Sequence, residues 1–273
     1  MKPSTLTSGG ALIFLLSTPA AWGHDPIFGI GPHVLYKGGV EIAVEGEADK
    51  AGSEKEQALT LELTYGLTGD WAAGAELPYA YRQEGSESNS GNGDVALFTK
   101  YRFWRRDSLG LQESAAVLLK VVTDTADGSG TPRLDKGATD TILGLTYGYE
   151  GRRWYRWAGI RYRFNGKNDA GLERGDRVLL DFVGGYRPRL TGYREPDTVW
   201  LLELNGEYGK RASLHGSDLP DTGGTEWFLS PGLFWTRRNF AVKAGVQVPI
   251  YSNLNGDQDE SDYRAKVVLE WHL

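Results

Sequence analysis

The chain has 273 residues, 40% of them hydrophobic, and a formal net charge of −6. No apolar run approaches the ~20 residues that a membrane helix needs, which excludes a helical membrane protein. With Cys 0, disulfides, thiolate metal sites and cysteine nucleophiles are excluded, and the negative charge gives no indication of a nucleic-acid partner. The counts of Gly 37, Tyr 14 and Trp 9 favour β-structure with tight turns.

The chain begins with the pattern of an export signal: a lysine, a short apolar core and small residues before His24. We therefore expect residues 1–23 to be a signal peptide. Residues 24–34 contain several Pro and Gly residues and are expected to be a lead-in without strand structure, either periplasmic or folded into a lumen. The α-amine and imidazole of His24 form a weak candidate metal site, for which an exposed terminal histidine is the simpler interpretation. No other metal site and no cofactor is predicted.

From residue 35 to residue 273, apolar and polar side chains alternate in about twelve segments. In the last of them, Tyr263, Val267 and Trp271 lie at alternate positions, together with the segment's other large apolar residues Leu269 and Leu273. Successive strand residues point to opposite sides, so each segment has an apolar face and a polar face. Pro78 predicts a bulge or a weakened strand. The expected strands are 35–45, 57–67, 71–82, 94–105, 109–123, 139–149, 153–164, 176–187, 198–208, 225–236, 240–251 and 262–273.

The connections between these strands alternate in length. We expect long links at 46–55, 83–93, 124–138, 165–175, 210–224 and 253–261, with short ones between them. A soluble sandwich has no reason to alternate in this way, whereas outer-membrane barrels have short periplasmic turns and long extracellular loops. The sequence therefore predicts an all-β protein, an antiparallel transmembrane β-barrel of about 12 strands over residues 35–273. Its expected location is the outer membrane of a Gram-negative bacterium.

Charged residues on the inward parity are the candidate lumen lining. They are Glu41, Glu45, Glu62, Glu76, Lys100, Arg102, Lys120, Arg161, Arg163, Arg177, Asp181, Glu203, Glu207, Lys243, Arg264 and Lys266. Acidic residues come from the first three strands and basic ones mainly from strands four to eight, which predicts a transverse field across a narrow pore. In that interpretation Arg161, Arg163 and Lys100 determine the charge preference of the pore for the solutes that pass through it. The alternative is that the charges interlock and plug the lumen.

An enzyme is not predicted. A Ser-His-acid arrangement needs a histidine beside a nucleophile and a third, orienting group. His24 and His33 lie before or at the start of the barrel, His215 lies in a long link and His272 is the penultimate residue. No G-x-S-x-G motif occurs. Inward carboxylates inside a barrel are generally paired with Arg and Lys rather than used as acid and base.

Three stretches carry a resemblance to a known family. They are His24–Gly29 leading to Gly31-Pro32-His33, then Glu76-Leu77-Pro78-Tyr79, and Gly245–Tyr251 followed by Leu254-Asn255-Gly256. Together they resemble the outer-membrane barrel family of the MetA pathway of phenol degradation, whose members are often called transporters. The resemblance implies passive passage of small molecules, such as aromatic or hydrophobic compounds, and no catalytic residue.

The expected function is thus an outer-membrane channel or transporter. A plugged structural or adhesion barrel is the alternative, and an outer-membrane lipid hydrolase the third hypothesis. The expected partners are the lipid bilayer, the barrel-assembly machinery through the C-terminal strand, and a small-molecule solute.

Overall fold

The computed structural model of the chain describes residues 25–126, 128–192 and 194–273. The expected signal peptide 1–23 and the candidate metal ligand His24 lie outside the described residues. No described residue belongs to a helix long and apolar enough to cross a membrane.

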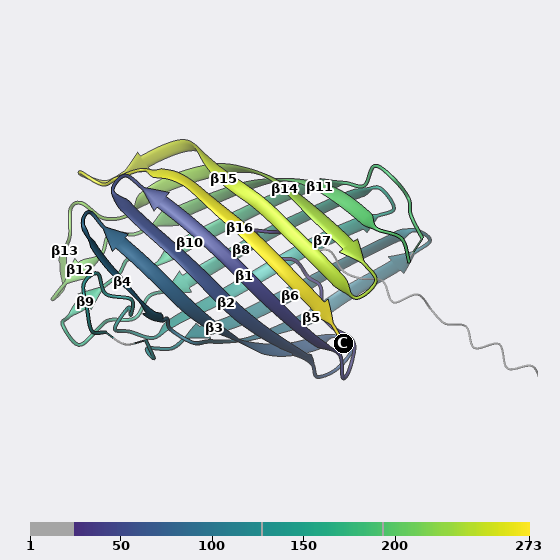
Figure 1. Cartoon of the computed structure of the whole chain (residues 1–273), viewed down its shortest axis with the longest axis horizontal. Coiled ribbons are helices and arrows are strands. Elements are labelled where there is room, and N and C mark those ends of the chain that lie inside the picture. The colour runs from purple at the N-terminus through teal and green to yellow at the C-terminus, as the bar shows by residue number, and fades with distance from the viewer. Residues whose placement is uncertain (1–24, 127, 193) are drawn as a thin grey trace, which may run out of the picture.

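Twelve antiparallel strands form a closed barrel, as the alternation predicts (Figure 1). Each strand pairs with the next one in the barrel, and the first pairs with the last, with Glu41 opposite His272 and Lys50 opposite Tyr263. The barrel strands are β1 (Val40–Ala51), β2 (Glu54–Gly66), β3 (Trp71–Glu84), β5 (Ala96–Ser108), β6 (Leu111–Val122), β7 (Asp140–Gly151), β8 (Trp154–Phe164), β10 (Arg177–Tyr186), β11 (Asp197–Gly209), β14 (Gly224–Arg237), β15 (Phe240–Leu254) and β16 (Ser261–His272).

The two faces of the barrel wall differ as the residue parity predicts. Leu59 is 57% exposed and Leu202 is 51% exposed on the outside, whereas the next residue along β11, Glu203, is 0% exposed. The outside carries a belt of exposed Leu, Val, Ile, Tyr, Phe and Trp side chains on every barrel strand except β1, whose outward Val40, Ile42 and Val44 are half-buried. Exposing so large an apolar surface is unfavourable in water and favourable in the hydrocarbon of a bilayer.

One of the expected long links is wrong. β1 continues to Ala51 and β2 begins at Glu54, so only Gly52 and Ser53 connect them. Gly52 has the positive φ of 53° that this tight turn requires. The expected first strand also begins too early, because Gly38, with φ 81°, makes a turn before Val40. Both differences arise where the strands are polar on both faces or interrupted by glycine.

Of the two effects expected of Pro78, a bulge or a weakened strand, the bulge does not occur. β3 keeps its register with β2 through the pair Thr60–Pro78. On its other side, β3 pairs with β5 up to Glu76 and with the short strand β4 (Glu87–Asn92) from Tyr79 onward. Pro78 therefore lies where β3 changes partner, a position at which its missing N–H breaks no ladder.

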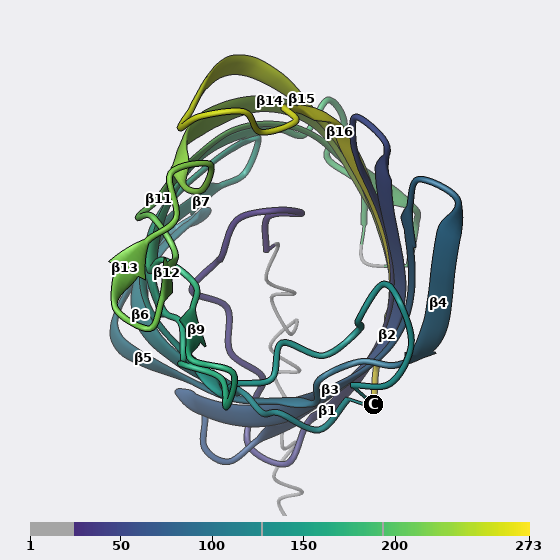
Figure 2. The same ribbon diagram turned by 90° about the vertical axis from the view of Figure 1, so that its left-hand side faces the viewer.

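The long links lie at one end of the barrel. There β9 (Leu172–Glu173), β12 (Ser213–Leu214) and β13 (Ser217–Asp218) form a small second sheet. Figure 2 looks into the barrel from this end and shows the N-terminal segment, in purple, inside the ring of strands. Of the two places expected for this segment, the described part occupies the lumen.

The lumen as candidate functional site

The N-terminal segment, here residues 25–35, is held in the lumen by a buried carboxylate. Glu203 Oε1 accepts a hydrogen bond from the backbone N–H of Ile27 at 2.6 Å. Its Oε2 accepts from Phe28 at 3.2 Å and from Gly29 at 3.0 Å. Three successive N–H groups that converge on one anion form a nest. Since all these partners donate, the geometry fits an ionised Glu203, which is an acceptor only.

Three further contacts fasten the same segment to other strands. Lys100 Nζ lies 3.0 Å from Asp25 Oδ2. Arg161 donates to the carbonyl of Phe28 at 3.2 Å, and Thr146 Oγ1 donates to the carbonyl of Ile30 at 2.8 Å. The segment is therefore attached to β5, β7, β8 and β11 through side chains, without joining the strand ladder.

The inner face of the barrel is apolar near the short links. Ile27 packs there in a buried cluster whose other members are Tyr155, Trp157, Val183, Val199, Leu201, Phe234 and Ala241, with Phe28 against it. Sequence reasoning missed this cluster. The signal was present in Val199–Leu202, where four consecutive apolar residues break the alternation and indicate that both faces of β11 are covered.

Inward glycines make room for the segment. A Cβ at Gly232 would lie 2.3 Å from Ile27 Cδ1, and one at Gly148 would lie 2.8 Å from Pro32 Cγ. A Cβ at Gly144 would lie 3.0 Å from Ile30 Cδ1. These glycines are required because the backbone of the segment passes close to the barrel wall.

All sixteen predicted lumenal residues lie on the inner face or at its ends, and most form ion pairs. The pairs are Glu45 with Lys266, Glu76 with Lys120, Lys100 with Asp25, Arg102 with Asp70, Arg161 with Asp181, Arg163 with Asp140, Arg177 and Arg264 with Glu207, and Lys243 with Glu270. Glu41 Oε2 lies 3.2 Å from Nδ1 of His272, a contact that is ionic only when the imidazole is protonated. Glu62 instead accepts a hydrogen bond from Thr64 at 3.0 Å. The charges therefore interlock locally.

The three basic residues expected to set charge preference are all in such pairs. Arg161 Nη2 lies 2.8 Å from Asp181, which is 2% exposed, and Arg163 Nη2 lies 2.5 Å from Asp140, which is 0% exposed. This geometry corresponds to the second of the two interpretations, in which the arginines are structural partners. Asp140 was missed as a lumenal residue although it shares the inward parity of Thr146.

Burial and neighbouring charges in the lumen shift the pKa values of two groups in the segment, His33 and Asp25. Burial lowers the pKa of His33 to about 4, so its imidazole is neutral near neutral pH. Burial raises the pKa of Asp25, but the neighbouring positive charges, chiefly Lys100, outweigh it and hold the pKa at about 2. The Asp25 carboxyl beside Lys100 is therefore ionised over the whole physiological range of pH.

Two cavities remain beside the segment. The larger, about 290 Å³, lies between the segment and strands β1, β2, β3, β5, β6, β7, β8, β15 and β16. The smaller, about 180 Å³, lies toward β10 and β11. Phe28, Arg161 and Lys266 line both cavities, so the segment and its contacts divide the space inside the barrel.

These features define a class: a closed antiparallel barrel of twelve strands with an apolar exterior, a charged interior and an N-terminal segment inside it. A family model described as "Putative MetA-pathway of phenol degradation" matches residues 65–253. This match covers more than half of the chain, and the chain belongs to that family. The resemblance carried by the sequence motifs is thereby confirmed.

Solved structures that align with this chain include an outer membrane channel and a porin. An outer membrane channel from Pseudomonas putida F1 aligns with a TM-score of 0.72 and 14% identity, over 92% of this chain and 100% of that one. The NanC porin aligns with a TM-score of 0.49 and 12% identity, over 85% of this chain and 100% of the porin. The first match supports the fold alone, and no curated protein sequence matches this chain.

Proposed function

We propose that the chain is a passive outer-membrane channel for small molecules, closed at rest by residues 25–35. The observation that carries the proposal is the attachment of this segment. It is held in the lumen by contacts with the side chains of Glu203, Lys100, Arg161 and Thr146, while the barrel closes through β1 and β16 without it. A segment outside the ladder can leave without opening the barrel wall.

The apolar belt supports a bilayer as the surroundings, and we propose the outer membrane of a Gram-negative bacterium as its location. The short links would then face the periplasm and the long ones the exterior. The C-terminal strand β16 is the part that we expect the barrel-assembly machinery to bind. Aromatic or other hydrophobic small molecules are the proposed solutes, on the strength of the family description.

A disulfide between the segment and the wall tests the closure. The chain has Cys 0, so Ile27→Cys with Gly232→Cys introduces a unique pair. The exchange at Ile27 also removes the methyl that a side chain at Gly232 would meet. In planar bilayers the reduced variant should conduct, and oxidation should abolish the conductance. Ile27→Cys alone, oxidised in the same way, is the control.

A permanently plugged scaffold is the second candidate, favoured by the paired charges of the lumen. It predicts no conductance and no solute flux from either the wild type or the reduced variant. Unchanged conductance after verified cross-linking would instead show that the segment is not the gate.

The arginine pairs change the expectation for the lumen charges. Arg161→Glu with Arg163→Glu would place each new carboxylate beside a buried aspartate. Asp181 would lose its arginine, whereas Asp140 would keep Arg174, whose Nη2 lies 2.9 Å from it. Removing one partner of a buried ion pair destabilises the fold by about 3–5 kcal/mol. We therefore expect a lower unfolding midpoint. A stable barrel whose reversal potential in a salt gradient shifts toward cations would restore these arginines as selectivity residues.

A further inference from the structure

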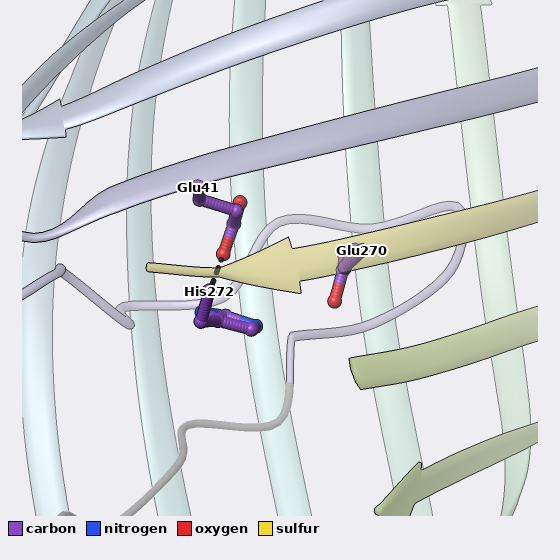
Figure 3. A group of neighbouring side chains, drawn as sticks. All are labelled: Glu41, Glu270 and His272. Carbon is purple, nitrogen blue, oxygen red and sulfur yellow. Dashed lines mark ion pairs between the residues drawn. The ribbon is translucent and has the colours of Figure 1, made fainter. Parts of the chain in front are cut away.

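Three side chains that commonly bind metals meet where the barrel closes. Glu41 comes from β1, and Glu270 and His272 come from β16, with Glu41 opposite His272 and Ala43 opposite Glu270. One ligand atom from each lies within 4.8 Å of the other two. Figure 3 shows the three side chains on the same side of the two strands, with Glu41 and His272 in contact. Strand pairing alone therefore fixes their proximity.

One of the three distances between ligand atoms already matches that around a bound ion. Ligand atoms about 2.0–2.2 Å from a tetrahedral Zn²⁺ lie about 3.3 Å from one another. Glu41 Oε2 and His272 Nδ1 are already 3.2 Å apart. Small side-chain rotations would bring in Glu270, and the 290 Å³ cavity, which all three residues line, leaves space for an ion with bound water.

A neighbouring ammonium competes for this position. Lys243 Nζ lies 2.5 Å from Glu270 Oε1, which leaves the second oxygen of that carboxylate to bind an ion. Glu41 and Glu270 bring two carboxyl groups against the one ammonium of Lys243. Asp25 in the same cavity is paired with Lys100, and Glu62, which also lines it, accepts a hydrogen bond from Thr64. Lys243 should thus weaken cation binding without preventing it.

We propose that Glu41, Glu270 and His272 bind a first-row divalent transition metal ion such as Zn²⁺. One imidazole with two carboxylates suits this class better than Ca²⁺ or Mg²⁺, which prefer oxygen ligands alone. The bound ion would bridge β1 and β16, the two strands whose pairing closes the barrel. Its site is separate from Glu203 and does not depend on whether the lumen conducts.

Titration with Co²⁺ and then Zn²⁺ tests the site in the folded mature chain in detergent. We expect one Co²⁺ per chain with visible ligand-field absorption, displaced by Zn²⁺, and a Zn²⁺-dependent rise in the unfolding midpoint. His272→Ala and Glu41→Gln should each weaken binding at least about tenfold. Lys243→Met should strengthen it severalfold, a result that no purely structural role of this lysine explains.

Two of the other three histidines, His215 and His24, provide the controls. His215 lies in a link at the far end of the barrel, so His215→Ala should bind the metal ion as the wild type does. His24→Ala should also retain the ion, since His24 could otherwise chelate it with the α-amine. Binding that survives His272→Ala, or that disappears with His24→Ala, would overturn the proposal, as would the absence of binding by the folded wild type. Heat-modifiable migration on a denaturing gel verifies that each variant is folded.

Discussion

Replacing Glu203 with Gln should release the N-terminal segment. The carboxylate accepts from the amides of Ile27, Phe28 and Gly29, and hydrogen bonds to a charged group contribute about 1.5–3 kcal/mol each. Glutamine retains one acceptor oxygen and turns an NH₂ group toward donors. The loss is equivalent to one or two of these hydrogen bonds. It should weaken docking of the segment by about 3 kcal/mol, which lowers the docking equilibrium constant about 100-fold.

Hydrogen exchange measures this change directly. In Glu203→Gln the amides of residues 27–29 should exchange about 100-fold faster than in the wild type, and the open probability in bilayers should rise. Glu207→Gln is the matched control, because this residue is on the same strand and pairs with Arg264 without contacting the segment. Equal protection of the three amides in Glu203→Gln and wild type would refute the role assigned to the carboxylate.

Three further predictions concern the same lumen and the outer face. Gly232→Ala should weaken docking of the segment by about 1–3 kcal/mol of overpacking, seen as faster exchange of its amides, whereas Gly184→Ala, which meets nothing within 4 Å, should not. Docking should weaken as pH falls from about 6.5 to about 4, because the released segment binds a proton at His33 that the docked segment excludes. Docking should weaken further from about pH 4 to pH 2, because the pKa of Asp25 is lowered from 3.8 to about 2 in the docked segment. Amide protection constant from pH 7 to pH 3 would contradict both assignments. Leu202→Arg should reduce the free energy of folding into lipid vesicles by about 2–4 kcal/mol if the outer face contacts hydrocarbon, and by almost nothing if it contacts water.

The sequence by itself determined the number of strands and the direction of their side chains. Alternation is a local property, because neighbouring strand residues such as Leu202 and Glu203 must point to opposite sides whatever the rest of the chain does. With one face apolar on every strand, a closed barrel follows without knowledge of any contact. Strand ends were less determined. β1 and β2 continue past the apolar belt with polar residues on both faces, so the expected loop at 46–55 is mostly strand.

Only the tertiary structure decided what the inward residues do. Whether Arg161 faces a partner or an open pore depends on register between strands, which places Asp181 of β10 beside it. The occupant of the lumen depends on contacts between residues far apart in the chain, such as Ile27 with Glu203. Parity assigns a side chain to a face, but the depth and stagger of each strand around the barrel decide which charges meet, and these arise from closure of the whole sheet.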